Sequence, residues 1–337
     1  MENIKIAILG HGNVGGGTCE ILSQNMQLIS ERIDKKILVS YILVSDTKKT
    51  RKWPTLGAKL TDNFEEILNS DVQIVVEVLG GIERASSYME DALKTGKHVV
   101  TANKAALAAN YPILTKAAKD SGVSLLFEAS VGGGIPALSA ILGNLRGNRF
   151  SEVSGILNGT TNYILTKMGS EALAYDDVLK SAQELGFAEA DPTADVEGID
   201  AANKLSILMA LCFDKYVHPD DIPRKGISHI TLDDIKSAKS QGKKIKLLGT
   251  ARLKDAIHLS QNAENAKLAD KASEIEYFVE PVSIDDSHPL FNVDNEYNGI
   301  LIRGNAVEDV MMYGKGAGPL PTGSAVVGDI LKIAENL

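Results

Sequence analysis

The first 130 residues alternate short apolar runs with amphipathic stretches. Five runs have the length and composition of buried strands: 4–9, 37–44, 72–79, 98–101 and 124–128. Three intervening stretches space their apolar side chains as helices do: 14–30, 83–95 and 110–121. Apolar strands that alternate with helices are typical of a parallel sheet covered on both faces. This half of the chain therefore predicts an α/β domain with a Rossmann-type, doubly wound parallel sheet.

The pattern changes after residue 130. Gly132, Gly133, Gly134 and Pro136 interrupt it, and beyond them the predicted strands follow one another without intervening helices. These strands are 245–252, 256–259, 275–282 and 299–303. This order predicts an α+β domain with an antiparallel or mixed sheet. A last helix is expected at 325–334, so we expect one domain of residues 1–130 plus about 311–337 and a second of about 131–310.

Composition excludes several classes of protein. The chain has 337 residues, more than one core usually organises, and a net charge of -9 that suits neither nucleic acid nor an anionic membrane. No apolar stretch reaches the length of a membrane helix, and the N-terminus enters a strand pattern directly, unlike a signal peptide. Cys19 and Cys212 are too few for a disulfide framework. We expect a cytoplasmic protein with no membrane or nucleic-acid partner.

A glycine-rich turn follows the first strand. Residues 10–15 read GHGNVG, which fits G-x-G-x-x-G between a strand and a helix. Gly10 would make the tight turn, Gly12 would let the backbone approach a pyrophosphate, and Gly15 would allow close helix–strand packing. The helix N-terminus would then offer N–H groups to phosphates. We interpret this turn as a dinucleotide site; the alternative is a glycine-rich turn without a ligand.

Asp46 follows the second predicted strand, near the place of an acid that binds the ribose of NAD. Three basic residues come next: Lys48, Lys49 and Arg51. The acid favours NAD, whereas the basic residues could accept the extra phosphate of NADP or form only a solvated turn. The sequence does not choose between the two nucleotides.

Residues 182–204 gather carboxylates around one lysine. Within sixteen residues lie Glu189, Asp191, Asp195, Asp200 and Lys204. Asp200 and Lys204 are four residues apart, so on a helix they share one face. Such a pair is most often a solvated surface pair. However, residues 205–213 are apolar almost all round, which is typical of a buried helix. The pair is therefore expected at the edge of a core, facing a cleft or solvent.

This segment, AQELGFAEADPTADVEGIDAANK, resembles the signature of homoserine dehydrogenases at every fixed position. Four further stretches are similar to that family, in its order: VVTANK (99–104), EASVGGGIP (128–136), LNGTTNY (157–163) and GAG (316–318). With the glycine turn, the resemblance spans nearly the whole chain. It implies a nucleotide-binding domain, a substrate-binding and dimerisation domain, and NAD(P)-dependent interconversion of L-homoserine and L-aspartate 4-semialdehyde.

The resemblance also implies roles for residues. Lys204 would exchange the proton of the substrate oxygen, Lys104 would be a second active-site lysine near the nicotinamide, and Asp200 would orient Lys204. Substrate binding is expected at Glu189, Asp195, Gly159 and Thr160. These residue types suit the chemistry, because hydride transfer to a carbonyl leaves negative charge on oxygen and a lysine ammonium stabilises it.

The implied cofactor contacts are Gly10, Gly12, Asn13, Val14, Gly15, Asp46, Thr101, Lys104 and Gly318. The cofactor would be NADP or NAD. The implied ligands of a monovalent cation, usually Na⁺, are Glu128, Val131, Gly133 and Ile135, mainly through carbonyl oxygens. Read without the family, residues 132–134 would be only a domain junction.

Some features depart from the family or leave alternatives open. Ser45 stands where relatives often carry an arginine for the NADP phosphate, so the resemblance does not decide the nucleotide. The chain resembles a short form without the regulatory ACT domain of many relatives, so we expect no threonine feedback through such a domain, and strong sigmoidal inhibition by threonine would contradict this. A homodimer or higher homo-oligomer is expected. The alternatives are another amino-acid or imino-acid dehydrogenase, or a non-catalytic dinucleotide sensor.

Overall fold

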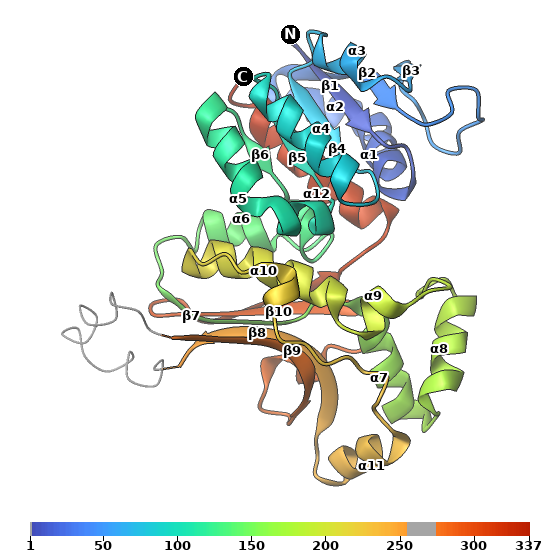
Figure 1. Ribbon diagram of the computed structural model, residues 1–337, viewed down its shortest axis with the longest axis vertical. Helices are drawn as coiled ribbons and strands as arrows, with labels where there is room; N and C mark the ends of the chain where they lie inside the picture. Colours follow the sequence, from blue (N-terminus) through green and yellow to red (C-terminus); the bar gives the residue numbers. More distant parts are fainter. Residues whose placement is uncertain (1, 255–273) are drawn as a thin grey trace, which may run out of the picture. The chain divides into compact units, whose positions relative to one another are not determined.

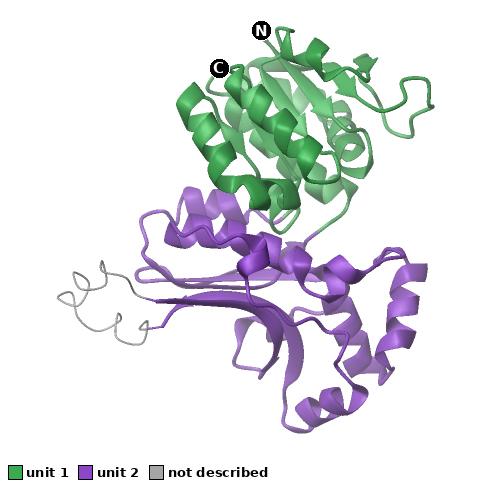
Figure 2. Cartoon of the chain, in the orientation of Figure 1, with its two compact units in different colours: residues 1–134, 317–337 green, residues 135–316 purple. Residues whose placement is uncertain are grey.

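The computed structural model describes residues 2–254 and 274–337 (Figure 1). The chain forms two compact units, residues 1–134 with 317–337 and residues 135–316 (Figure 2). Each unit has its own sheet. The strand expected at 256–259 lies outside the described residues. No described helix combines the length and the apolar character that crossing a membrane requires.

The first unit contains a parallel sheet of six strands in the order β3-β2-β1-β4-β5-β6. The strands are β1 Glu2–Leu9, β2 Lys35–Leu43, β3 Lys59–Thr61, β4 Ile74–Glu77, β5 His98–Thr101 and β6 Leu125–Leu126. The helices are α1 Asn13–Gln24, α2 Met26–Ile33, α3 Phe64–Leu68, α4 Glu83–Lys94, α5 Lys104–Ser121 and α12 Pro319–Ala334, with a short 3₁₀ turn, η1 Glu128–Ser130. The strand order reverses between β1 and β4, where doubly wound sheets bind ligands at the carboxyl ends of the strands. The expected fold class is confirmed.

Burial on both faces of the sheet explains why its strands have apolar sequences. Ile4, Ile6 and Ile8 of β1 have no exposed surface, and all four residues of β4 are equally buried. Strands covered on both faces must be apolar at successive positions, which is the pattern that predicted them. The expected helix 14–30 is instead two helices that meet at Asn25, and β3 and α3 were not predicted because their apolar runs are too short.

Helices α1 and α12 approach so closely that only glycine fits at their contact. A Cβ on Gly17 would lie 2.1 Å from the carbonyl oxygen of Pro319, and one on Gly323 would lie 2.8 Å from the backbone of Gly17. Both clashes are with backbone, which cannot turn aside as a side chain can. The C-terminal helix is thereby fixed against the helix that follows the glycine turn.

This contact predicts a stability difference between two Gly→Ala changes. Gly17→Ala should destabilise the first unit by about 1–3 kcal/mol through overpacking. Gly328→Ala, in the same helix pair, should be neutral or stabilising by up to about 1 kcal/mol, because nothing lies within 4 Å of its added Cβ. Denaturant unfolding can be followed by the fluorescence of Trp53, the single tryptophan of the chain. Equal midpoints for the two variants would contradict the packing described here.

The second unit contains a five-stranded sheet in the order β11-β10-β7-β8-β9, and every pair of these strands is antiparallel. The strands are β7 Phe150–Ile156, β8 Lys244–Leu253, β9 Ile275–Ile284, β10 Tyr297–Gly304 and β11 Glu308–Lys315. The helices are α6 Ala137–Leu142, α7 Gly159–Glu171, α8 Tyr175–Glu184, α9 Thr193–Val196, α10 Ile199–Phe213 and α11 Leu232–Ser240, with 3₁₀ turns η2 Pro219–Asp221 and η5 Pro289–Asn292. Helix α10 contacts β7, β8 and β9, so its mostly apolar surface is covered by the sheet.

Strands β7 and β11 were not predicted. Because β11 belongs to the second sheet, the boundary between the units differs from the expected one. The expected first domain resumed at about residue 311, but residues 308–315 pair with β10 in the second sheet. The chain returns to the first unit at Ala317, and it leaves that unit after Gly134 rather than after residue 130. Strand β11 contains one short apolar run, Val310 to Tyr313, flanked by charged residues and glycine, and none of its residues is fully buried, which is why the apolar pattern did not reveal it.

Candidate active site

The glycine turn between β1 and α1 leaves an open path to backbone N–H groups. Gly10 has a φ of 103°, and a Cβ there would lie 2.9 Å from the carbonyl oxygen of Val78. A Cβ on Gly15 would lie 2.1 Å from the Gly10 carbonyl oxygen, so the turn and the helix pack without space between them. Around Gly12, by contrast, nothing lies within 4 Å of an added Cβ. Gly12 is the N-cap of α1 and no side chain caps this end, so its N–H groups fit a phosphate.

The segment after β2 folds back onto this turn. The indole of Trp53 packs on Gly16, where a Cβ would lie 2.0 Å from Cδ1 of the ring. His11 Nε2 lies 3.1 Å from the carbonyl oxygen of Pro54, and burial lowers the pKa of this histidine. The Asp46 carboxylate accepts a hydrogen bond from the backbone N–H of Lys48, 2.8 Å long. Trp53 is therefore held on the glycine turn and can report on what binds there, whereas Asp46 is fixed by contacts within its own loop.

A buried glutamate organises the carboxyl ends of β4 and β5. Glu77 has no exposed surface, and it accepts hydrogen bonds of 2.7 Å from the Thr101 hydroxyl and from the backbone N–H of Leu79. Burial raises the pKa of Glu77. The Thr101 hydroxyl accepts from the N–H of Asn103, whose side chain caps α5. This network fixes Thr101 and the start of α5, where Lys104 lies. Sequence reasoning missed Glu77; its only signal is a charge inside an apolar strand.

Two buried carboxylates lie together at η1. Glu128 and Asp329 are 8% and 7% exposed, and the backbone N–H of Glu128 donates to Asp329 Oδ2 over 2.8 Å. Burial raises the pKa of Asp329 to about 7, and the negative charge of Glu128 adds to the effect. Gly132 and Gly133 follow with φ of 75° and 58°, which glycine adopts without strain. Buried negative charge beside a turn with freely oriented carbonyls fits a hard monovalent cation.

The other expected cation ligands divide between the units. Val131 and Gly133 belong to the first unit with Glu128, whereas Ile135 is the first residue of the second unit. Asp329 was not predicted, because it is 201 residues from Glu128 in the chain. Within residues 2–254 and 274–337, no three His, Cys, Asp or Glu residues are grouped as ligands of a metal ion.

In the second unit, Lys204 and Asp200 form a buried pair on α10. They are 7% and 6% exposed. The Lys204 ammonium donates to Asp200 Oδ2 and to the carbonyl oxygen of Leu157, each over 2.6 Å. Removing an ammonium and a carboxylate from water is costly unless both are paired, as they are here. The pair is therefore not a solvated surface pair.

Asn158 joins this pair to a second carboxylate. Its side-chain Nδ2 donates to Asp200 Oδ2 over 2.9 Å and to Asp195 Oδ1 over 2.7 Å. Its Oδ1 accepts from the N–H of Thr161 and so caps α7. One amide thus connects the N-terminus of α7 with carboxylates from α9 and α10. Asn158 was missed as a site residue, although an asparagine before a predicted helix is a recognisable N-cap signal.

The remaining substrate-site candidates surround the start of α7 and the segment after α8. Gly159 is the first residue of α7, where a Cβ would lie 2.6 Å from the carbonyl oxygen of Glu296. The Thr160 hydroxyl donates to the carbonyl oxygen of Phe187 over 2.8 Å. Glu189 is exposed, and its side chain makes no hydrogen bond to the Asn158 network. The structure thus joins Asp195, Asp200 and Lys204 through hydrogen bonds, and Glu189 presents an exposed side chain on the segment after α8.

A doubly wound sheet with an open glycine turn, and a separate unit with a buried lysine–aspartate pair, together define a two-domain, dinucleotide-dependent oxidoreductase. Two family profiles match the chain: "Homoserine dehydrogenase, NAD binding domain" over residues 10–128 and "Homoserine dehydrogenase" over residues 136–331. The chain belongs to the homoserine dehydrogenase family.

Individual relatives agree with this assignment. A homoserine dehydrogenase from Bacillus subtilis is 41% identical over 338 residues, which cover 100% of this chain and 74% of the relative. A solved homoserine dehydrogenase from Thiobacillus denitrificans is 40% identical with a TM-score of 0.90, covering 99% of this chain and 74% of that one. A hyperthermophilic archaeal homoserine dehydrogenase mutant, solved in complex with NADPH, is 25% identical with a TM-score of 0.79, covering 99% of this chain and 98% of that one.

Proposed function

We propose that the Asn158–Asp195–Asp200–Lys204 network is the centre of reversible, NAD(P)-dependent interconversion of L-homoserine and L-aspartate 4-semialdehyde. The observation that carries the proposal is the buried Lys204 ammonium, fixed by Asp200 and Leu157 at 2.6 Å each. This reaction would serve the threonine and methionine branch of amino-acid biosynthesis.

Each residue of the network has a separate role in this reaction. A nicotinamide bound to the first unit would supply the acceptor for the hydride of the homoserine alcohol carbon. In its neutral amine form Lys204 would accept the proton of that hydroxyl during oxidation and become the ammonium. During reduction the ammonium would return the proton, and its charge would stabilise the developing oxyanion. Asp200 and Leu157 hold the lysine, and Asn158 holds Asp200. Asp195 and Glu189 would bind the substrate ammonium, while the backbone of Gly159 and Thr160 would position its carboxylate.

The nucleotide would occupy the first unit. The open N-terminus of α1 would hold its pyrophosphate, Asp46 its ribose, and Thr101, Lys104 and Gly318 would lie near the rest of the molecule. A direct assay measures the absorbance of reduced nicotinamide with homoserine and NAD⁺ or NADP⁺. Turnover of a different amino acid or of an imino acid, with none of homoserine, would overturn the proposal. Nucleotide binding without any turnover would favour a sensor.

Asp46 should decide the nucleotide preference. Asp46→Ala is expected to lower kcat/KM for NAD⁺ by about tenfold, because a charged group hydrogen-bonded to ribose contributes roughly 1.5–3 kcal/mol. The value for NADP⁺ should stay the same or rise, since the carboxylate that repels its extra phosphate is gone. Asp62→Ala, at an exposed acid just after β3, is the matched control. An unchanged ratio between the two nucleotides in Asp46→Ala would refute this role.

A monovalent cation is also proposed at Glu128, with carbonyl oxygens of Val131, Gly133 and Ile135. The buried carboxyl groups of Glu128 and Asp329 support it, since both can offer oxygen atoms to a cation. Turnover should be higher in NaCl than in choline chloride at equal ionic strength. Glu128→Gln should raise the Na⁺ concentration for half-maximal activity by about tenfold, because ligand charge sets cation affinity. Equal rates in both salts would rule the cation out of the reaction.

We further infer a cytoplasmic homodimer or higher homo-oligomer. Strand β11 lies at the edge of its sheet and exposes Met311 and Tyr313 at 41% and 52%. Apolar side chains on an unpaired edge strand are usually covered by another chain or element. Sedimentation equilibrium should therefore give a mass of at least two chains, and Met311→Lys should weaken the association.

A further inference from the structure

The second unit contains a cavity outside the network described above. Its volume is about 340 Å³, and we call it the lysine cavity. Helix α7, helix α11, the start of β8 and the segment from η5 line it. Apolar side chains form part of its wall, and four lysines surround them. The apolar residues are Leu165, Ile235, Ile245 and Phe291, and the lysines are Lys239, Lys243, Lys244 and Lys246.

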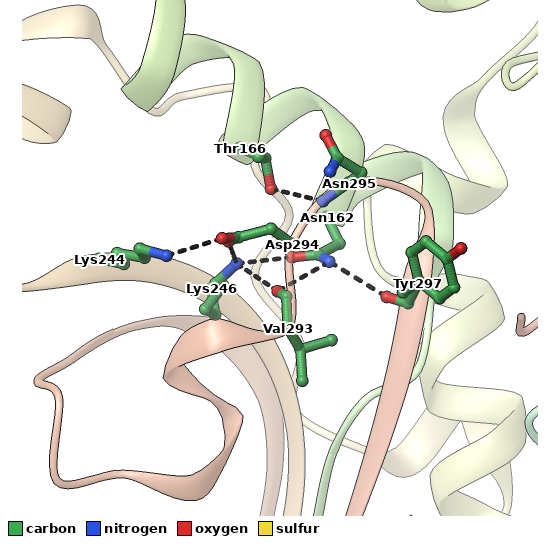
Figure 3. Close-up of polar contacts among 8 residues, drawn as sticks. All are labelled: Asn162, Thr166, Lys244, Lys246, Val293, Asp294, Asn295 and Tyr297. Atoms are coloured by element: carbon green, nitrogen blue, oxygen red, sulfur yellow. Dashed lines mark hydrogen bonds and ion pairs between the residues drawn. The ribbon is translucent and has the colours of Figure 1, made fainter. Parts of the chain in front are cut away.

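Two of these lysines share one carboxylate, which offsets only part of their charge. Lys246 is 1% exposed, and its ammonium donates to Asp294 Oδ1 over 2.8 Å, to the Val293 carbonyl over 2.6 Å and to Asn162 Oδ1 over 3.0 Å (Figure 3). Lys244 pairs with Asp294 Oδ2 over 2.8 Å, and its ammonium lies 4.6 Å from the ring centre of Phe291. Both oxygens of Asp294 are thus engaged by lysines.

The other two lysines add to the positive charge of the cavity. Lys239 donates only to a neutral group, the carbonyl oxygen of Gly169, over 3.2 Å. Lys243 lies near the carboxylate of Asp285, whose pKa its charge helps to lower, and it faces no carboxylate within the cavity lining other than Asp294. Asp294 is the sole carboxylate among the described lining residues. The carbonyls that end α11 are engaged by backbone N–H groups of residues 241–243, so they offset little of this positive charge.

We propose that the lysine cavity binds a small organic anion with one anionic head and an apolar body. Lys239 and Lys243 would take the head, and Leu165, Ile235 and Phe291 would enclose the body. A zwitterionic amino acid is disfavoured, because the single negative charge of Asp294 is already shared by the ammonium groups of Lys244 and Lys246, which would repel a third ammonium. Helix α7 connects the two sites, because Asn158 is its N-cap and its residues Thr166 and Gly169 line the cavity.

The test uses the complete chain and two probes that differ by one charge. These are 8-anilinonaphthalene-1-sulfonate and its uncharged analogue N-phenyl-1-naphthylamine, titrated by fluorescence with saturating NAD⁺ or NADP⁺ to occupy the dinucleotide site. The sulfonate should bind at least about tenfold more tightly than the neutral probe, which corresponds to one well-placed charge.

Two variants alter the cavity independently. Lys243→Glu reverses the charge of a lysine that lines the cavity, and Gly169→Leu fills the space. A Cβ at position 169 would meet only Ile235, at an ordinary 3.7 Å, so this side chain enters the cavity without a backbone clash. Each variant should weaken the sulfonate about tenfold or more. Lys180→Glu, an exposed lysine of α8 outside the cavity, makes the same charge change and should leave the affinity within about twofold.

The other results would overturn the proposal. If neither cavity variant weakens the sulfonate, the probe binds elsewhere. If Lys243→Glu and Lys180→Glu weaken it equally, the effect is one of net charge. If only Gly169→Leu weakens it and both probes bind alike, the cavity is apolar without a preference for anions. Thermal unfolding of each variant establishes that it is folded before it is titrated.

Discussion

Replacing Lys204 by alanine is expected to lower turnover by ~10²-fold or more while nucleotide affinity stays near that of the unmodified chain. The lysine ammonium is the group that would exchange a proton with the substrate oxygen, and its atoms belong to the second unit. The glycine turn and Trp53 belong to the first unit. Quenching of Trp53 fluorescence by NADH or NADPH therefore measures nucleotide binding separately from the reaction.

A stability control is needed, because Lys204→Ala leaves the buried Asp200 carboxylate without its ammonium partner. Breaking a buried ion pair in this way costs about 3–5 kcal/mol. The double variant Asp200→Asn with Lys204→Met removes both charges and should recover most of that stability while turnover stays low. If the double variant recovered turnover as well, Lys204 would be a structural residue. Near-normal turnover in Lys204→Ala would contradict the proposed role directly.

Asn158→Asp should be the second most damaging change, lowering kcat/KM by about 10²-fold. It replaces the amide N–H groups that bind Asp195 and Asp200 with a third carboxylate. The two lost hydrogen bonds to charged groups contribute roughly 1.5–3 kcal/mol each, and repulsion between like charges adds to the loss. Helix capping should survive, because aspartate caps helices about as well as asparagine.

The pH dependence distinguishes a positioning role from a general loss of structure. An added negative charge favours the protonated form of a nearby ammonium. The rise of the homoserine oxidation rate with pH should therefore move to higher pH in Asn158→Asp, in addition to the fall in rate. Asn63→Asp, which makes the same change at the exposed N-cap of α3, should alter neither quantity. A loss of rate with an unmoved pH profile would argue against positioning of Lys204 through Asp200.

The sequence by itself determined the features that depend on residues close together in the chain. Apolar runs of a few residues revealed β1, β2, β4 and β5, because strands buried on both faces must be apolar at successive positions. The glycine turn was recognisable because its three glycines and its flanking strand and helix are contiguous. Asp200 and Lys204 were placed on one face because helical geometry relates residues four apart. The resemblance of residues 182–204 to the family signature indicated the activity.

The tertiary structure decided which distant groups meet and how deeply they are buried. The amide of Asn158 reaches carboxylates 37 and 42 residues away, and Glu128 reaches Asp329 over 201 residues. Strands β7 and β11 became evident only through their pairing with β10. Local periodicity records which face of an element is apolar, but not which element covers it. Only the packed chain could therefore show that the Lys204–Asp200 pair lies in the interior and that four lysines enclose a cavity.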